Sequence, residues 1–143
     1  MVRFKHRYLV ATVAASPGQT ADLGAKDILA MLKDSIATTF GDMGAGLTAP
    51  DLQVRSFDAE SGVCIVRAGR DSYRMVNAAL TLLSGKEGAS LSVTVEAVAG
   101  CDRTLKAAAM AAYARGYHRA GLDAEAAAAL LQQKSRSLDV QER

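Results

Sequence analysis

The sequence predicts an α+β fold in which helices pack on a four-stranded antiparallel sheet, and three observations lead to it. Four short stretches alternate apolar with polar residues or are continuously apolar, as strands do. Two longer stretches repeat apolar residues every three or four positions, as helices do. Together they follow one another as strand, helix, strand, strand, helix, strand, which is the order of the ferredoxin-like (RRM-like) split β-α-β-β-α-β sandwich.

The first strand is predicted over residues 8–15, which end at a Ser-Pro-Gly turn signal. A helix is predicted from about residue 23, because apolar residues at helical spacing form one face. They are Ile28, Leu29, Leu32, Ile36 and Phe40. We expect Thr20 or Asp22 to cap this helix and Gly41 to end it.

The glycines of residues 41–46 invite comparison with a phosphate-binding loop. Such a loop presents backbone N–H groups at the start of a helix, whereas these glycines follow a helix, where its dipole is negative. We therefore interpret residues 41–46 as a helix end and a loop.

The second half of the sandwich is predicted as two strands, a helix and a fourth strand, at residues 52–57, 63–68, 73–83 and 91–98. The first two strands are joined by a hairpin loop that ends in Gly62. Asp71 or Ser72 is expected to cap the helix. In the fourth strand, alternation places Val95 and Ala97 on one face.

An alanine-rich helix is predicted at about residues 102–120, and a second, short helix at about residues 123–134. Residues 1–134 are expected to form a single RRM-like domain, with its core at about residues 8–100 and the C-terminal helices at about 101–134. Residues 135–143 are expected to be a flexible polar tail. The added helices would either cover the open face of the sheet or pack beside it for a partner.

Charge is distributed unevenly along this 143-residue chain, although its formal net charge is only +2. Residues 1–8 contain three basic and no acidic residues. Residues 101–119 contain four basic residues against one aspartate. If the fold brings these two segments together, they form the kind of basic patch that nucleic-acid binding requires.

Several kinds of chemistry have no support in the sequence. Cys64 and Cys101 are separate thiols without a CxxC motif, so a zinc site is not expected, and both are expected to be reduced. The two imidazoles, His6 and His118, have no carboxylate near them in sequence that would complete a catalytic set. No apolar run reaches the length of a membrane helix. We expect no catalytic residue, metal or cofactor.

The N-terminal octet alternates basic residues with rings, a pattern that suits contact with nucleic acid. The third strand contains no ring, so the base-stacking platform of an RNA-recognition motif is missing, and phosphate contact with folded RNA remains. The candidate RNA-binding residues are Arg3, Lys5, His6, Arg7, Arg67, Arg70, Arg103 and Lys106. The plain alternative for the octet is a solvated N-terminal arm.

Four stretches of the chain carry a resemblance to a known family. They are residues 1–10, residues 32–44, residues 57–67 continuing through Arg70 and Tyr73 to Leu80, and Gly100 with Arg103 and Thr104. Over residues 1 to about 117 the sequence resembles the Pop-five protein subunit family of ribonuclease P and ribonuclease MRP. It departs from the family where Cys101-Asp102 replaces a Thr-Ile pair before the arginine.

The resemblance implies a non-catalytic subunit that binds and stabilises the structured catalytic RNA of ribonuclease P and MRP. In this family the RNA removes the 5′ leader of precursor tRNA, and the related MRP particle processes precursor rRNA. The implied partners are a barrel-type subunit and other proteins of the same particle. The implied location is the nucleus, chiefly the nucleolus. Neither a membrane nor a small-molecule substrate is expected.

Two other functions are compatible with the predicted fold. One is a ferredoxin-like small-molecule-binding or regulatory module, which has no need of basic segments at both ends of its sequence. The other is a purely protein-binding scaffold. RNA that copurifies with the chain would separate the first from an RNA-binding subunit, and crosslinking of the assembled particle would separate the second.

Overall fold

The computed structural model describes residues 5–15, 23–85 and 90–141. Its elements are β1 (His6–Ala15), α1 (Ala25–Thr48), β2 (Gln53–Asp58), β3 (Val63–Gly69), α2 (Tyr73–Thr81), β4 (Leu91–Ala99), α3 (Asp102–Arg119) and α4 (Ala124–Gln141). The four strands form one antiparallel sheet in the order β2-β3-β1-β4. The predicted ferredoxin-like order, with additional C-terminal helices, is confirmed.

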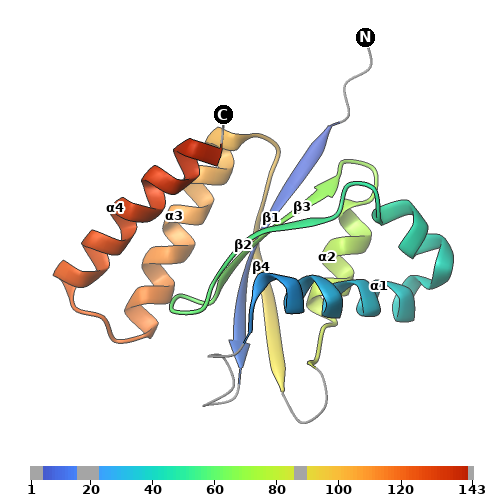
Figure 1. Ribbon diagram of the computed structural model, residues 1–143, viewed down its shortest axis with the longest axis horizontal. Helices are drawn as coiled ribbons and strands as arrows, with labels where there is room; N and C mark the ends of the chain where they lie inside the picture. The colour runs from blue at the N-terminus through green and yellow to red at the C-terminus, as the bar shows by residue number, and fades with distance from the viewer. Residues whose placement is uncertain (1–4, 16–22, 86–89, 142–143) are drawn as a thin grey trace.

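Helices cover both faces of this sheet, α1 and α2 on one side and α3 and α4 on the other (Figure 1). Successive side chains of a strand point to opposite faces of the sheet, so one strand contributes residues to the cores on both faces. In β1, Leu9 and Val13 point into the α1/α2 core, whereas Val10 points into the α3/α4 core. The sequence left open whether the C-terminal helices cover the open face of the sheet or pack beside it, and the structure shows that they cover it.

Two β-bulges change which face a side chain occupies. The β1–β4 register shifts between Val10 and Ala11, so Val95 packs in the α1/α2 core while Ala97 packs in the α3/α4 core. The predicted shared face for these two residues is therefore wrong. A second bulge between Val54 and Ser56 inserts Arg55 into β2 without a paired residue on β3.

Helix α1 is longer than predicted. Gly41, with φ of 71°, kinks the helix as expected of a helix-ending glycine, but helical structure resumes and continues to Thr48. The predicted loop over residues 41–46 is thus wrong. Of the predicted caps, Thr20 and Asp22 lie outside the described residues. Instead, the Asp27 carboxylate accepts a hydrogen bond from the Gly24 N–H at 2.9 Å.

The predicted polar tail is also wrong, because α4 continues to Gln141. Leu138 is buried in the α3/α4 core, where it extends the apolar face of α4 that includes Leu130 and Leu131. The polar residues that suggested a tail lie on the outward side of this helix, so composition concealed its apolar face. Residues 142–143 lie outside the described residues.

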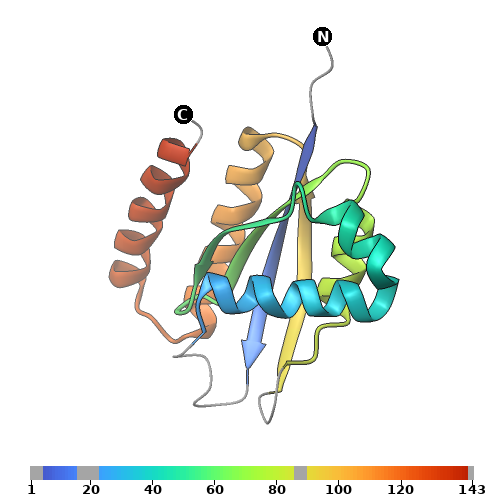
Figure 2. The same ribbon diagram turned by 45° about the vertical axis from the view of Figure 1, so that its right-hand side comes forward.

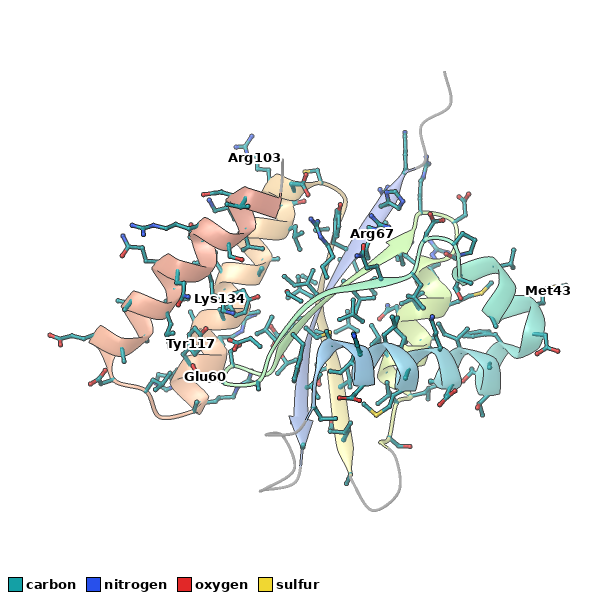
Figure 3. All side chains as sticks on the ribbon, in the orientation of Figure 1. Met43, Glu60, Arg67, Arg103, Tyr117 and Lys134 are labelled. Atoms are coloured by element: carbon teal, nitrogen blue, oxygen red, sulfur yellow. The ribbon has the colours of Figure 1, made fainter. Side chains whose placement is uncertain are left out.

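One end of the sheet, which we call the hairpin end, is closed by a polar network of Asp58, Ser61, Tyr117 and Lys134. Asp58 Oδ2 accepts hydrogen bonds from Ser61 Oγ at 2.7 Å and Tyr117 Oη at 2.8 Å, and Lys134 Nζ lies 3.9 Å away. Figure 3 shows Tyr117 and Lys134 close together beside the hairpin. The network ties both C-terminal helices to the β2–β3 hairpin.

Electrostatics at the hairpin end match this geometry. Burial raises the pKa of the Asp58 carboxyl, but the hydrogen bonds from Ser61 and Tyr117 and the charge of Lys134 outweigh it and leave the pKa below its ordinary value. Gly116 is required here as well. A Cβ atom at this position would lie 2.7 Å from Ser61 Cβ and 2.9 Å from Ser61 Cα, far inside van der Waals contact.

The two cysteines differ in their surroundings. Cys64 is buried in the α1/α2 core, and this burial raises its pKa to about 12, so it is an unreactive core residue. Cys101 is exposed at the residue before α3. Both are free thiols.

Candidate nucleic-acid interface

The end of the sheet opposite the hairpin collects most of the predicted basic residues, and we call it the basic end. Because β1 is antiparallel to both its neighbours, its start lies beside the ends of β3 and β4: His6 pairs with Gly69, and Tyr8 pairs with both Arg67 and Ala99. Helix α3 starts directly after β4, which places Arg103 at the same end (Figures 2 and 3). The fold thus brings together cations from three separate segments.

The backbone holds the start of β1 in this place. The Arg70 N–H donates a hydrogen bond to the Lys5 carbonyl oxygen at 2.9 Å, which fastens the residue before β1 to the chain leaving β3. The Arg7 guanidinium donates to the His6 carbonyl at 3.1 Å and lies beside Gly100. Lys5 and Arg70 are exposed, so their charges face solvent. Arg3 lies outside the described residues.

Two predicted contact residues already have carboxylate partners. His6 Nε2 lies 3.3 Å from Asp51 Oδ1, and both side chains are about two-thirds buried or more, with exposures of 27% and 33%. Lys106 forms an ion pair with Asp139 of α4. Both are therefore less available to a phosphate than Arg103, which is exposed and has no ion-pair partner within residues 5–15, 23–85 and 90–141.

The basic end also contains a cation that the sequence prediction did not include. Arg55 Cζ lies 5.1 Å from the centre of the Tyr8 ring, a cation–π distance, and its Nη1 lies 3.8 Å from Asp102 Oδ1. The bulge in β2 places Arg55 there, and a bulge leaves no clear mark in a sequence. The available signal was weak: Arg55 is a basic residue inside a predicted strand.

The rest of the basic segment 101–119 does not join the basic end. Helix α3 rises about 1.5 Å per residue, so Arg119 lies roughly 24 Å along the axis from Arg103, at the hairpin end. Arg115 there donates a hydrogen bond to Glu96. Burial raises the pKa of the Glu96 carboxyl, and the hydrogen bonds from Arg115 and Thr12 outweigh this and lower it. The expectation of one patch from both whole segments is therefore correct only for the first turns of α3.

The sheet does not present the rings of an RNA-recognition motif. Tyr113 and Tyr117 are buried beneath the C-terminal helices, with ring centres 6.3 Å apart. On the strands, Tyr8 is half-buried with the Arg55 guanidinium above it. Because α3 covers the apolar part of this face and Arg55 lies over the Tyr8 ring, the face suits contact with phosphate better than stacking with bases.

Other kinds of site find no support in the part of the chain that the structure describes. None of its helices combines the length and the apolar character that crossing a membrane demands. Within the same residues, no three His, Cys, Asp or Glu side chains gather as a metal site would require. The grooves on the surface are shallow, and the one between α1 and the segment after α2 contains a single charged residue, Asp34.

Fold and site together define a class of small α+β domain: a ferredoxin-like sheet covered by helices on both faces, with one cationic end. The family model described as the Rpp14/Pop5 family matches residues 7–110. The chain therefore belongs to the Rpp14/Pop5 family.

Known relatives agree with this assignment. The ribonuclease P/MRP protein subunit POP5 of Schizosaccharomyces pombe is 30% identical over 125 residues, covering 80% of this chain and 88% of the relative. The Bos taurus subunit of the same name is 33% identical over 88 residues, which are 61% of this chain and 52% of its own length.

A solved structure supports the fold. A chain of the cryo-EM structure of yeast ribonuclease MRP superposes with a TM-score of 0.52, covering 72% of this chain and 79% of that one at 11% sequence identity. The family model and the curated relatives confirm the resemblance to the Pop-five family that the sequence carries.

Proposed function

We propose that this chain is the Pop5-type, non-catalytic protein subunit of a ribonuclease P ribonucleoprotein, and that the related ribonuclease MRP particle uses it too. It binds and stabilises the catalytic RNA core, while the RNA removes the 5′ leader of precursor tRNA; in the MRP particle the substrate is precursor rRNA. Family membership and the names of the relatives support this role.

The observation that carries the RNA-binding part is the gathering of cations at the basic end. Lys5, Arg7, Arg67, Arg70 and Arg103 come from the start of β1, the end of β3 and the start of α3. Side chains on rigid strand ends hold their charges at fixed spacing, so crowded phosphates of a folded RNA are neutralised without reading its bases. Arg103 lies in the first turn of α3, where the helix dipole disfavours a cation, and a bound phosphate offsets that cost.

Partners and location follow from the same proposal. The chain assembles with a barrel-type subunit and other proteins of the particle, and it works in the nucleus, chiefly in the nucleolus. Affinity purification of the tagged chain from its source, followed by identification of the bound RNA and proteins, tests this directly. Recovery of neither ribonuclease P RNA nor MRP RNA would contradict the proposal.

A salt-dependence experiment tests the contact itself. Arg3, Lys5 and Arg7 are changed together to Ala, and binding to ribonuclease P RNA transcribed in vitro is measured over a range of salt concentrations. Each lost phosphate contact reduces the slope of log affinity against log salt by about one unit, so we expect a loss of up to about three. A control variant removes three exposed cations elsewhere: Lys26, Lys33 and Arg136. Equal slopes in the two variants would exclude the N-terminal arm as an RNA contact.

A further inference from the structure

We propose that Arg55 and Arg67 form a second phosphate-binding site, which lies on the α3-facing side of the sheet and takes a phosphodiester of the same RNA. The proposal rests on the RNA-binding function above and extends it from the N-terminal arm onto the sheet surface. We call this site the guanidinium pair.

The first argument concerns Arg67. Its Nε atom is buried from solvent and has no hydrogen-bond acceptor among the described residues, although the side chain as a whole is only half-buried. A guanidinium N–H that is withdrawn from water without an acceptor is costly, and nearly all such groups in folded proteins find a partner. Nε itself is closed to solvent, so a surface ligand meets the exposed part of the side chain first, and Nε reaches the ligand only when the side chain turns outward.

The second argument concerns the position of Arg55. The β2 register passes from Val54, paired with Val66, to Ser56, paired with Ile65, so Arg55 is the extra residue of the bulge. Bulges redirect side chains and are frequent beside functional sites. Here the bulge places the guanidinium over Tyr8, and its Nη1 lies 3.8 Å from Asp102 Oδ1.

The third argument is that Arg55 and Arg67 lie on the same face of the sheet as Tyr8, on the neighbouring strands β2 and β3. Tyr8 is the register partner of Arg67, so these two side chains leave the same face of the sheet, and Arg55 reaches that ring from β2. Gln53, the β2 partner of Arg67, adds an exposed amide to the row. Farther along the same face the residues become apolar and α3 covers them, so the polar row marks where the covered surface ends.

The chemistry of two neighbouring arginines selects the ligand. Like charges on adjacent strands repel each other, and an anion between them removes that repulsion while accepting N–H groups from both. The planar fork of arginine matches the two free oxygens of a phosphodiester in a way that a lysine ammonium does not. Continuity with the basic end makes an RNA strand, rather than a free anion, the expected source of that phosphate.

The experiment compares Arg55→Gln, Arg67→Gln and Arg67→Lys in the full-length chain, with Arg115→Gln at the hairpin end as the matched control. Affinity for in-vitro-transcribed ribonuclease P RNA is measured against salt, and thermal unfolding verifies that each variant is folded. We expect each glutamine variant to lower affinity about tenfold and the salt slope by about one unit. Arg67→Lys is expected to keep the slope while losing affinity, because charge remains and the fork is lost.

A second measurement separates direct contact from structural damage. The Nε–H resonances of Arg55 and Arg67 are followed by NMR in the wild-type chain during titration with an RNA fragment, and separately with inorganic phosphate. Shifts of both resonances at RNA concentrations where phosphate has no effect support the proposal. Shifts with inorganic phosphate alone, or affinities of the glutamine variants equal to that of Arg115→Gln, would overturn it.

Failure of this inference is distinguishable from failure of the proposed function. If changing Arg3, Lys5 and Arg7 weakens RNA binding while the guanidinium pair can be removed without effect, the second site is wrong and the subunit role stands. If the wild-type chain does not bind the RNA, both proposals fail.

Discussion

The two ends of the sheet are built from the same four strands but differ in whether their polar side chains have hydrogen-bond and ion-pair partners. At the hairpin end the Asp58 carboxylate is satisfied by two hydroxyl donors and a lysine, and Gly116 allows α3 to touch the hairpin backbone. At the basic end, cations outnumber the carboxylates beside them, and Arg67 Nε has no acceptor among the described residues. The comparison indicates that the hairpin end holds the fold together, whereas the basic end is prepared for a partner.

The largest expected effect is the loss of close packing at the hairpin end. Gly116→Ala forces a methyl group into Ser61 and should lower the free energy of unfolding by about 2–3 kcal/mol. Gly46→Ala is the control, because a Cβ at that position meets nothing within 4 Å and alanine favours a helix. Urea unfolding of both variants measures the difference. If Gly116→Ala is as stable as Gly46→Ala, the hairpin end is not a close-packed anchor.

A smaller effect is expected from removing one donor of the hairpin network. Tyr117→Phe should cost about 1–2 kcal/mol at neutral pH, because a buried carboxylate loses a hydrogen bond. The folded-state pKa of Asp58 is below its ordinary 3.8, so the ionised carboxylate stabilises the fold above that pH, and this contribution is lost as the pH falls through the folded-state value. The stability difference between wild type and variant should therefore shrink below about pH 4. A difference that stays constant down to pH 2 would contradict the assignment.

The basic end should respond in binding rather than in stability. Arg103→Ala is expected to weaken RNA binding several-fold and to reduce the salt slope by about one unit. Lys106→Ala should have a smaller effect on binding, because Asp139 already neutralises the lysine. Both variants should unfold within about 0.5 kcal/mol of wild type, as exposed charges usually do. A larger binding loss for Lys106→Ala would show that the ion pair opens when RNA binds.

The smallest effect is expected from the carboxylate beside His6. Asp51→Asn removes a negative charge from the basic end while keeping the shape of the side chain, so RNA affinity should rise about two- to threefold at low salt. Asp34→Asn, an exposed aspartate on α1, is the control and should leave affinity unchanged. Filter binding at two salt concentrations distinguishes the two variants. Weaker binding by Asp51→Asn would mean that the carboxylate positions His6 for the RNA.

Local patterns predicted the elements of the sandwich but not all of their limits. In β1 the residues that pack in the α1/α2 core alternate along the strand, and in α1 the buried residues Ile28, Leu32 and Ile36 recur every four positions. Such spacing identifies a strand or a helix with a buried face even when the element that packs on that face is unknown. The end of α4 depends on the packing of Leu138 in the α3/α4 core, which residues distant in sequence form. The positions of Val95, Ala97 and Arg55 depend on register shifts, and these arise only when strands pair.

The sequence indicated which cations gather at the basic end, but not which of them are free of carboxylate partners and so available to RNA. Counting charges placed Arg7 and Arg103 in the two basic segments, and antiparallel pairing brings Arg67 and Arg70 to the same end as these residues. The same counting gave no sign that His6 and Lys106 have carboxylate partners, because Asp51 and Asp139 are far from them in sequence. Whether these residues contact RNA remains a prediction for the experiments above.

The amino-acid sequence by itself determined the order of strands and helices, the scarcity of rings on the strands and the family of the chain. Each of these depends on short stretches of neighbouring residues. Only the tertiary structure decided that α3 and α4 cover the second face of the sheet and that the basic segment of α3 is divided between its two ends. It also placed Arg55 over Tyr8, the β1 register partner of Arg67. The physical reason is that charge acts through space, so a set of cations becomes a site only when strand pairing has set the distances between them.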